Sequence, residues 1–334
     1  MFMKFYELIF IFLLMTSTII ASSSSSWFTS WMGLELNLLM IIPLIINKFN
    51  SSSTEATIKY FLVQAMSSTL FLIFSLMNYT FVKMNLINNS DILILSALMI
   101  KTGMPPFHFW FPQVVEKMAW KQCFIMLTWQ KIAPLILVSF IYNATITLFV
   151  ISGAVIGAMG GFNQNSMKKI LTYSSISHSS WMISIISQNF KIWLNYFLIY
   201  TLISFSIITM LFMFHINNIK NMIYKNINFM LKAMFSLNML SLGGLPPLFG
   251  FLGKFMVITK LLEMKFSFFV IMVLVGSSLI SLFFYFKTIY FLLTLNSSTM
   301  NFNKKIKNNK NNSTPFFLYS ILLNIMMPFL VMLT

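Results

Sequence analysis

The stretch KTGMPPFHFW, from Lys101 to Trp110, interrupts one apolar run of the chain, and SLGGLPPLFGFLGK, from Ser241 to Lys254, interrupts another. Proline removes a backbone donor and clashes with the preceding helical turn, so both runs should be broken helices. In a bilayer, irregular backbone is tolerated only where protein or water surrounds it. The two stretches therefore predict a polar region in the interior of a membrane protein. The residues that make the breaks are Pro105, Pro106, Gly243, Gly244, Pro246 and Pro247.

The composition around these stretches belongs to a polytopic membrane protein. Apolar residues make up 58% of the 334 positions and charged residues only 8%. A spanning helix needs about 20 apolar residues, so the chain predicts an all-α fold of about eleven transmembrane helices. The expected spans lie at about 5–22, 27–46, 58–78, 91–111, 123–142, 145–162, 170–187, 192–215, 234–259, 267–293 and 314–333.

The distribution of lysine predicts the orientation. The net charge of +16 would suggest nucleic acid as the partner of a soluble protein, but here the lysines fall mostly in loops, so no nucleic-acid binding is expected. On the side of the N-terminus lie Lys4, Lys48, Lys117, Lys121, Lys168, Lys169, Lys220, Lys225, Lys232, Lys304, Lys305, Lys307 and Lys310, and on the other side only Lys83, Lys191, Lys260 and Lys265. The N-terminus should therefore face the cytoplasm or matrix, and the C-terminus the opposite side.

The two breaks also predict an internal repeat. They lie five helices apart, so their host helices run in opposite directions, and the lysine precedes Pro-Pro in one break and follows it in the other. Two inverted repeats would produce this pattern, and broken helices at matching places point to an ion site. The expected organisation is a single domain with one repeat at 1–142, another at 145–293 and a C-terminal helix at 314–334. Coincidence is the alternative, because Gly and Pro are common in membrane helices.

Four charged residues fall deep within expected spans: Glu35, Lys101, Lys131 and Lys254. Each costs about 2.5 to 3.5 kcal/mol at the bilayer centre, roughly 10 kcal/mol together, so they indicate ion handling. Burial favours a neutral lysine and a nearby carboxylate favours a charged one, which is the chemistry of a proton relay. The alternatives are a structural carboxylate at Glu35, lysines that only donate to freed carbonyls, and, for Lys254, a side chain that reaches the interface.

Three further residues are possible relay groups. His178 falls mid-span among serines, where a structural histidine is an almost equal alternative. His108 follows the first Pro-Pro pair and could instead help the chain across the break, and Lys287 lies close enough to a helix end that reaching the interface is the preferred interpretation. The histidines lack metal-ligand spacing and Cys123 is the single cysteine, so no metal site and no cofactor are expected in this chain.

Five motifs in order resemble the antiporter-like chain 2 subunits of mitochondrial NADH-ubiquinone oxidoreductase, from an insect or similar animal. They are WMGLELN around Glu35, KTGMPPFHFWFPQV around Lys101, TWQKIAPL around Lys131, GGFNQNSMKKILTYSSISHSSW from Gly160 to Trp181, and GGLPPLFGFLGK ending at Lys254. The resemblance covers essentially the whole chain.

The resemblance implies a role in proton translocation. Glu35 and Lys101 would form the pair on the uptake half, Lys131 the central relay, and Lys254 the group that hands the proton onward. It further implies the mitochondrial inner membrane, with the N-terminus in the matrix and the C-terminus in the intermembrane space. The implied partners are chain 4L on the Glu35 side, chain 4 on the Lys254 side, accessory subunits, and lipids including cardiolipin. NADH, FMN, iron-sulfur clusters and ubiquinone would belong to partner subunits.

Two other functions fit the same residues. A free-standing cation/proton antiporter would share all the buried lysines, and transport by the isolated chain would favour it. A passive membrane scaffold would use Glu35 and the lysines only to tie helices together. The scaffold explains helix packing, but it does not explain why the charges follow the broken helices.

Overall fold

The computed structural model describes residues 5–46, 50–83, 87–141, 145–223 and 229–293. Within these ranges the chain forms fourteen helices and no β-strand. In chain order they are α1 (Phe5–Ser22), α2 (Trp27–Ile45), α3 (Ser51–Lys83), α4 (Ile87–Thr102), α5 (Trp110–Lys117), α6 (Trp120–Leu127), α7 (Trp129–Ser139), α8 (Ile146–Phe162), α9 (Met167–Ile186), α10 (Phe190–Met213), α11 (Lys220–Ile223), α12 (Phe229–Gly243), α13 (Phe249–Glu263) and α14 (Phe268–Leu293). The expected last span, 314–333, lies outside the described residues.

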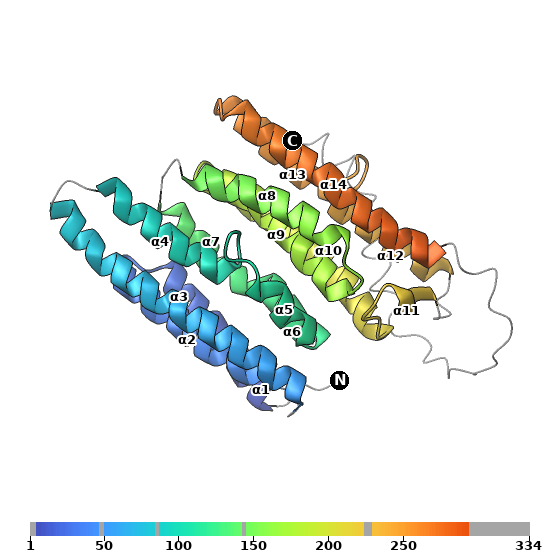
Figure 1. Ribbon diagram of the computed structural model, residues 1–334, viewed down its shortest axis with the longest axis horizontal. Coiled ribbons are helices and arrows are strands. Elements are labelled where there is room, and N and C mark those ends of the chain that lie inside the picture. The colour runs from blue at the N-terminus through green and yellow to red at the C-terminus, as the bar shows by residue number, and fades with distance from the viewer. Residues whose placement is uncertain (1–4, 47–49, 84–86, 142–144, 224–228, 294–334) are drawn as a thin grey trace.

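The helices lie side by side in approximate chain order (Figure 1). The blue helices α1 to α3 form one edge of the molecule, the orange helices α12 to α14 form the opposite edge, and α4 to α10 lie between them. Five stretches are long and apolar enough to cross a membrane: Trp27–Ile45, Ser51–Met77, Trp120–Ser139, Phe190–Met213 and Phe268–Leu293. The described chain is therefore that of an all-helical, multi-pass membrane protein.

The packing follows the rules of helices in lipid. Large apolar side chains point outward, for example Phe12, which is 65% exposed on α1. Helices meet instead through small residues, because lipid tails are as apolar as leucine and offer no hydrophobic drive between helices. A Cβ at Gly157 of α8 would lie 2.7 Å from the Ser177 backbone nitrogen of α9, and one at Gly33 of α2 would lie 2.7 Å from the Ala21 nitrogen of α1. Glycine at these positions allows the backbones to approach.

Helices of the structure overlap the first ten expected spans, but several ends differ from the prediction. The fourth span does not end near residue 111, because after the break a new helix, α5, continues to Lys117. Pro112 falls in the first turn of α5, where no backbone donor is needed, so it does not stop the helix. The fifth span is divided at Thr128 into α6 and α7 and ends at Ser139. The third begins at Ser51, because polar residues extend α3 beyond its apolar run.

Lys232 corrects the expected loop between the eighth and ninth spans. It was expected among the loop lysines, but it lies in α12, and only 4% of its surface is exposed. The sequence prediction started the ninth span at residue 234, whereas α12 begins at Phe229. Aromatic and apolar neighbours in FMLKAMF allow the helix to start earlier and to draw the lysine in.

Ion pairs tie the end of α5 to its neighbours. Lys117 pairs with Glu55 at the start of α3, and Lys169 Nζ of α9 lies 2.8 Å from a carboxylate oxygen of Glu116. Lys168 Nζ donates to the Glu116 carbonyl at 3.1 Å. These contacts hold three helices together at one end of the molecule.

Candidate functional site

The first break ends α4 directly after Lys101. Gly103 takes the left-handed backbone angle φ 69°, and a Cβ there would lie 3.0 Å from the Cβ of Phe111, so glycine is required. The break frees carbonyls that other side chains satisfy. Trp110 Nε1 donates to the Ile100 carbonyl at 3.2 Å, and Gln64 Nε2 of α3 donates to the Lys101 carbonyl at 3.3 Å. The carbonyls at the end of α4 are thus satisfied by protein side chains, whereas Phe107 and Phe109 later in the break are exposed.

Lys131 is the most buried of the predicted relay lysines, with 2% of its surface exposed. Its Nζ donates to the Ser175 carbonyl at 2.8 Å and to Ser179 Oγ at 2.7 Å, both on α9. It also lies 5.3 Å from the centre of the Phe111 ring. The division between α6 and α7 at Thr128 comes three residues before this lysine. The sequence predicted Lys131 mid-span but did not predict this third interruption.

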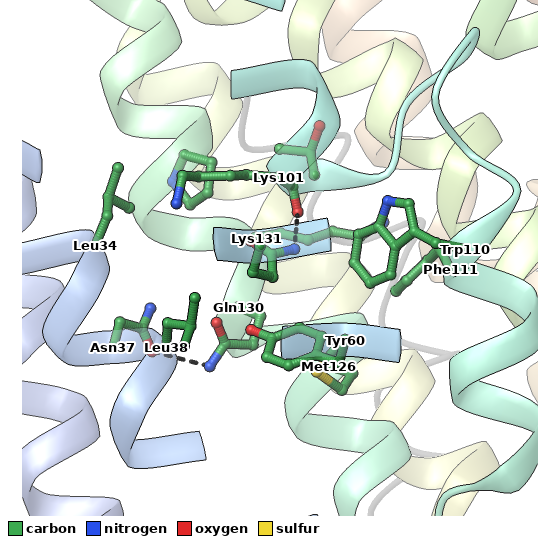
Figure 2. A pocket seen from close by; sticks show the side chains of 13 residues that line it. Leu34, Asn37, Leu38, Tyr60, Lys101, Trp110, Phe111, Met126, Gln130 and Lys131 are labelled. Carbon is green, nitrogen blue, oxygen red and sulfur yellow. Dashed lines mark hydrogen bonds between the residues drawn. The ribbon is translucent and has the colours of Figure 1, made fainter. Parts of the chain in front are cut away.

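A small cavity separates Lys101 from Lys131. In Figure 2 the two lysines lie between residues of α2 on the left and the rings of Trp110 and Phe111 on the right. The space for centres of water-sized spheres is about 20 Å³, and one water needs about 10 to 15 Å³ on this measure. The cavity therefore has room for one or two water molecules beside the two lysines. Its polar lining comes from Asn37, Tyr60, Gln64, Lys101, Thr102, Gln130 and Lys131.

An amide pair beside this cavity joins α2 to α7. Gln130 Nε2 donates to Asn37 Oδ1 at 2.9 Å, as the dashed line in Figure 2 marks. Asn37 is buried, and it follows Glu35 by two residues, while Gln130 directly precedes Lys131. Neither residue was predicted from the sequence. The pattern that could have indicated them is an amide within an otherwise apolar span, in LELNLL and TWQKIA, because a buried amide needs a hydrogen-bond partner.

Glu35 lies near Lys101 without pairing with it. The carboxylate is close enough to act electrostatically on Lys101, but among the described residues no ion pair within 4.0 Å joins them. Its buried Oε2 has no hydrogen-bond partner in the same part of the chain. Glu35 borders an outward-facing stripe of α2, where Met32 and Leu36 are exposed. It stands between the polar interior and the outer face of the molecule.

The second break holds Lys254. α12 ends at Gly243, Gly244 takes φ 75°, Pro247 takes φ 58°, and α13 begins at Phe249. Lys254 is 6% exposed, and its Nζ donates to the Gly243 carbonyl at 2.7 Å. The side chain therefore folds back onto the break and does not reach toward the interface. A Cβ at Gly244 would lie 3.0 Å from this Nζ, so the lysine occupies space that only glycine leaves open.

Helix α9 runs between the two lysines, and every residue from Ser174 to Ile186 is buried. His178 is 8% exposed, and its Nδ1 lies 2.8 Å from the Tyr196 hydroxyl. Lys131 and Lys254 are both close enough to act electrostatically on His178. Lys254 Nζ is 5.9 Å from the Trp181 ring centre on the same helix. One helix therefore contacts both lysines and carries the histidine.

The remaining candidates lie apart from this line. His108 is buried in the first break, 4.3 Å from the Phe109 ring centre, and its Nδ1 has no hydrogen-bond partner among the described residues. Lys287 of α14 is half-buried and has no hydrogen bond or ion pair within those residues. The described ranges contain no group of three or more His, Cys, Asp or Glu side chains that could hold a metal ion. The Cys123 thiol is buried and donates to the Val115 carbonyl at 3.4 Å.

Comparison with known proteins places this arrangement in one family. Residues 24–281 match the family model of the membrane subunits described as NADH:quinone oxidoreductase/Mrp antiporter. Three curated relatives bear the name NADH-ubiquinone oxidoreductase chain 2. The Anopheles gambiae protein is 43% identical over 91% of this chain and 90% of its own length, the Locusta migratoria protein is 39% identical over 91% and 90%, and the Mus musculus protein is 38% identical over 93% and 92%.

Solved structures share the fold at lower identity. A chain of respiratory complex I from Thermus thermophilus with bound aureothin superimposes with a TM-score of 0.80 at 23% identity, covering 87% of this chain and 71% of that one. A chain of the Mrp complex from Dietzia sp. DQ12-45-1b gives a TM-score of 0.72 at 18% identity, covering 87% and 61%. The antiporter-like fold expected from the sequence is therefore the fold observed.

Proposed function

Because this chain belongs to the NADH-ubiquinone oxidoreductase chain 2 family, we infer that it is an antiporter-like membrane-arm subunit of respiratory complex I that takes part in proton translocation. It contributes to the enzyme as a multi-pass membrane subunit of NADH:ubiquinone oxidoreductase. The cofactors of the complex are generally held by other subunits. In this chain the functional question is how a proton moves through the helices.

The observation that carries the proposal is the line of buried lysines at broken helices. We propose that protons pass from the region of Glu35 and Lys101 through the small cavity to Lys131, and from there by way of His178 to Lys254. Burial disfavours the ammonium form of each lysine, whereas an approaching carboxylate favours it. Movement of Glu35 relative to Lys101 would therefore load or unload a proton. The unpaired Oε2 of Glu35 and the absence of an ion pair with Lys101 in the described residues support a carboxylate that is free to change partner.

The proposal includes a membrane topology. The chain would have eleven spans, with inverted repeats at 1–142 and 145–293 and a last helix at 314–334. The two breaks support the repeats, since Lys101 precedes the first and Lys254 follows the second. The protein would lie in the mitochondrial inner membrane with its N-terminus in the matrix and its C-terminus in the intermembrane space, as the lysine distribution favours.

Partners and cofactors follow from the two edges of the molecule. Glu35 lies on α2 at one edge and Lys254 lies on α13 at the other (Figure 1). We propose chain 4L beside the first edge and chain 4 beside the second, with accessory subunits and lipids, cardiolipin among them, covering the remaining apolar faces. NADH, FMN, iron-sulfur clusters and ubiquinone would act in partner subunits, and the charge change that follows ubiquinone reduction would reach Glu35 from its neighbour.

The test is Lys131→Met in the intact complex. Methionine keeps most of the volume of the side chain but cannot carry a proton, so proton pumping coupled to NADH oxidation should fall at least tenfold while the complex still assembles. The measurements are acidification driven by NADH in sealed inner-membrane vesicles and native electrophoresis with an NADH-dehydrogenase stain. Unchanged pumping in an assembled variant would refute the relay, and a chain that migrates away from the stained band would favour a free-standing antiporter.

A further inference from the structure

The path between Lys131 and Lys254 contains a histidine with one direct side-chain partner. His178 interacts electrostatically with both lysines, and Lys131 donates to Ser175, one helical turn before the histidine on α9. The Nδ1 of His178 lies 2.8 Å from the Tyr196 hydroxyl, and the histidine side chain also bonds the Leu242 backbone. If the His178 imidazole accepts and releases a proton, the Tyr196 hydroxyl is the side-chain group positioned to exchange that proton with Nδ1.

Tyr196 connects His178 to the helix of Lys254. The phenol comes from α10, and 3% of the residue is exposed. A Cβ at Gly253 would lie 2.9 Å from Cδ2 of this ring, so Tyr196 packs against the α13 backbone at the residue directly before Lys254. The hydroxyl of Tyr196 thus contacts His178 of α9, while its ring packs against the backbone of α13.

Two more buried phenols surround this contact. Tyr200 lies one turn later on α10, with its ring centre 5.1 Å from that of His178. Tyr285 of α14 has no exposed surface, and its hydroxyl lies close to the Ser174 side chain of α9 without forming a hydrogen bond of good geometry. Both act electrostatically on Tyr196. Phenylalanine would fill an apolar core without leaving a hydroxyl unpaired, and buried hydroxyls normally hold a partner or an ordered water. The buried hydroxyl of Tyr285 therefore marks a polar position inside the helix bundle.

We propose that the Tyr196 hydroxyl is a proton-relay group between His178 and Lys254, and that Tyr285 extends its hydrogen-bond chain. This inference rests on the proposed lysine relay and names residues that complete it. In each transfer the Tyr196 oxygen receives one proton from His178 and releases its own toward Lys254, so one O–H bond forms as another breaks. The phenol is neutral before and after the step, and no oxidant or phenolate is needed.

The experiment replaces Tyr196 by phenylalanine in the intact complex. The ring and its packing on Gly253 remain, and only the hydroxyl is lost. We expect the number of protons pumped per NADH oxidised to fall at least threefold, with the amount of assembled complex unchanged. NADH oxidation by a hydrophilic electron acceptor, which does not require the membrane subunits, should stay the same. Tyr290→Phe is the matched control, because it removes a phenol hydroxyl from a residue of α14 that is 63% exposed, and it should leave pumping unchanged.

A ratio of protons to NADH within 20% of that of the parent protein in the assembled Tyr196→Phe complex would overturn the inference. If that variant does not assemble, Tyr285→Phe replaces it, since it keeps the buried ring and removes only the hydroxyl that would extend the chain. Loss of pumping in Tyr285→Phe supports the proposal, and full pumping overturns it. Lys131→Met separates the two hypotheses: a fully active Lys131→Met complex refutes the lysine relay itself, whereas a silent Lys131→Met with a fully active Tyr196→Phe refutes only the role of Tyr196.

Discussion

Lys254 and the break beside it are built around each other. The lysine donates to the Gly243 carbonyl that the end of α12 leaves free, so the same contact satisfies a backbone acceptor and fixes the position of the buried amine. Gly244 makes room for the ammonium group through its left-handed backbone angle. At the residue scale, glycine and lysine therefore form one unit.

Gly244→Ala should disrupt this unit. An alanine in the left-handed region costs about 1 to 2 kcal/mol, and its methyl group would lie 3.0 Å from Lys254 Nζ. We expect pumping to fall severalfold and the thermal midpoint of the complex to drop, as measured by activity after graded heating. Gly276→Ala on α14 is the control, since a Cβ there meets nothing within 4 Å. Equal behaviour of the two variants would argue against the lysine and glycine acting together.

The amide pair of Asn37 and Gln130 gives a second residue-scale prediction. Gln130→Leu leaves a buried amide oxygen of Asn37 without its donor, which should cost about 1 to 3 kcal/mol. Because the pair joins the helix of Glu35 to that of Lys131, NADH-driven pumping should also decline. A double-mutant cycle with Asn37→Leu should show a coupling free energy of about 0.5 to 3 kcal/mol in thermal unfolding. Additive effects would contradict a direct link. Thr69→Val, which loses a bond only within α3, is the control.

At the element scale, the sequence located most helices but not all their interruptions. The Pro-Pro breaks were predictable because proline cannot continue the backbone ladder. The interruption at Thr128 was not, because no proline or glycine marks it; Thr128 Oγ1 instead donates to the Phe124 carbonyl of its own helix at 2.7 Å. The early start of α12 was not predictable either. A lysine such as Lys232 is typical of a loop, and only the structure shows that it is buried within the helix. Glu35, Lys101, Lys131 and Lys254 could be proposed as candidates from the cost of burying charge. The partners of Lys131 on α9, Ser175 and Ser179, could be found only in the folded arrangement.

The close contact of α8 with α9 supplies an element-scale prediction. Gly157→Val places a Cβ within 2.7 Å of the Ser177 backbone nitrogen, so α8 must move away from α9 directly beside His178. We expect less assembled complex on native electrophoresis and lower pumping per assembled complex. Val155→Leu changes the same helix on its outward side, where the residue is 45% exposed, and should have no effect. Normal assembly and pumping of Gly157→Val would mean that the two helices tolerate separation.

At the scale of the whole molecule, the outer faces carry the apolar surface that a soluble protein would bury. Phe12 on α1 faces outward, so lipid tails or an apolar partner surface must cover it. Phe12→Lys should lower the amount of assembled complex, because a lysine at the bilayer centre costs about 2.5 to 3.5 kcal/mol. Phe12→Leu keeps the apolar surface and should assemble normally. Quantitative native electrophoresis compares the two, and equal amounts would place α1 outside the hydrocarbon region.

The helices are laid out from edge to edge, and the chain is interrupted three times along that line, after Thr102, at Thr128 and after Gly243. Each interruption has its own lysine close by. A path built this way behaves like switches wired in series, in which the current stops as soon as one switch opens. The reductions in pumping caused by substituting Lys101 and Lys254 would then not be additive. The double variant would pump as much as the single variant that pumps less. If the protein had parallel proton routes, each substitution would instead remove a further part of the pumping that remained.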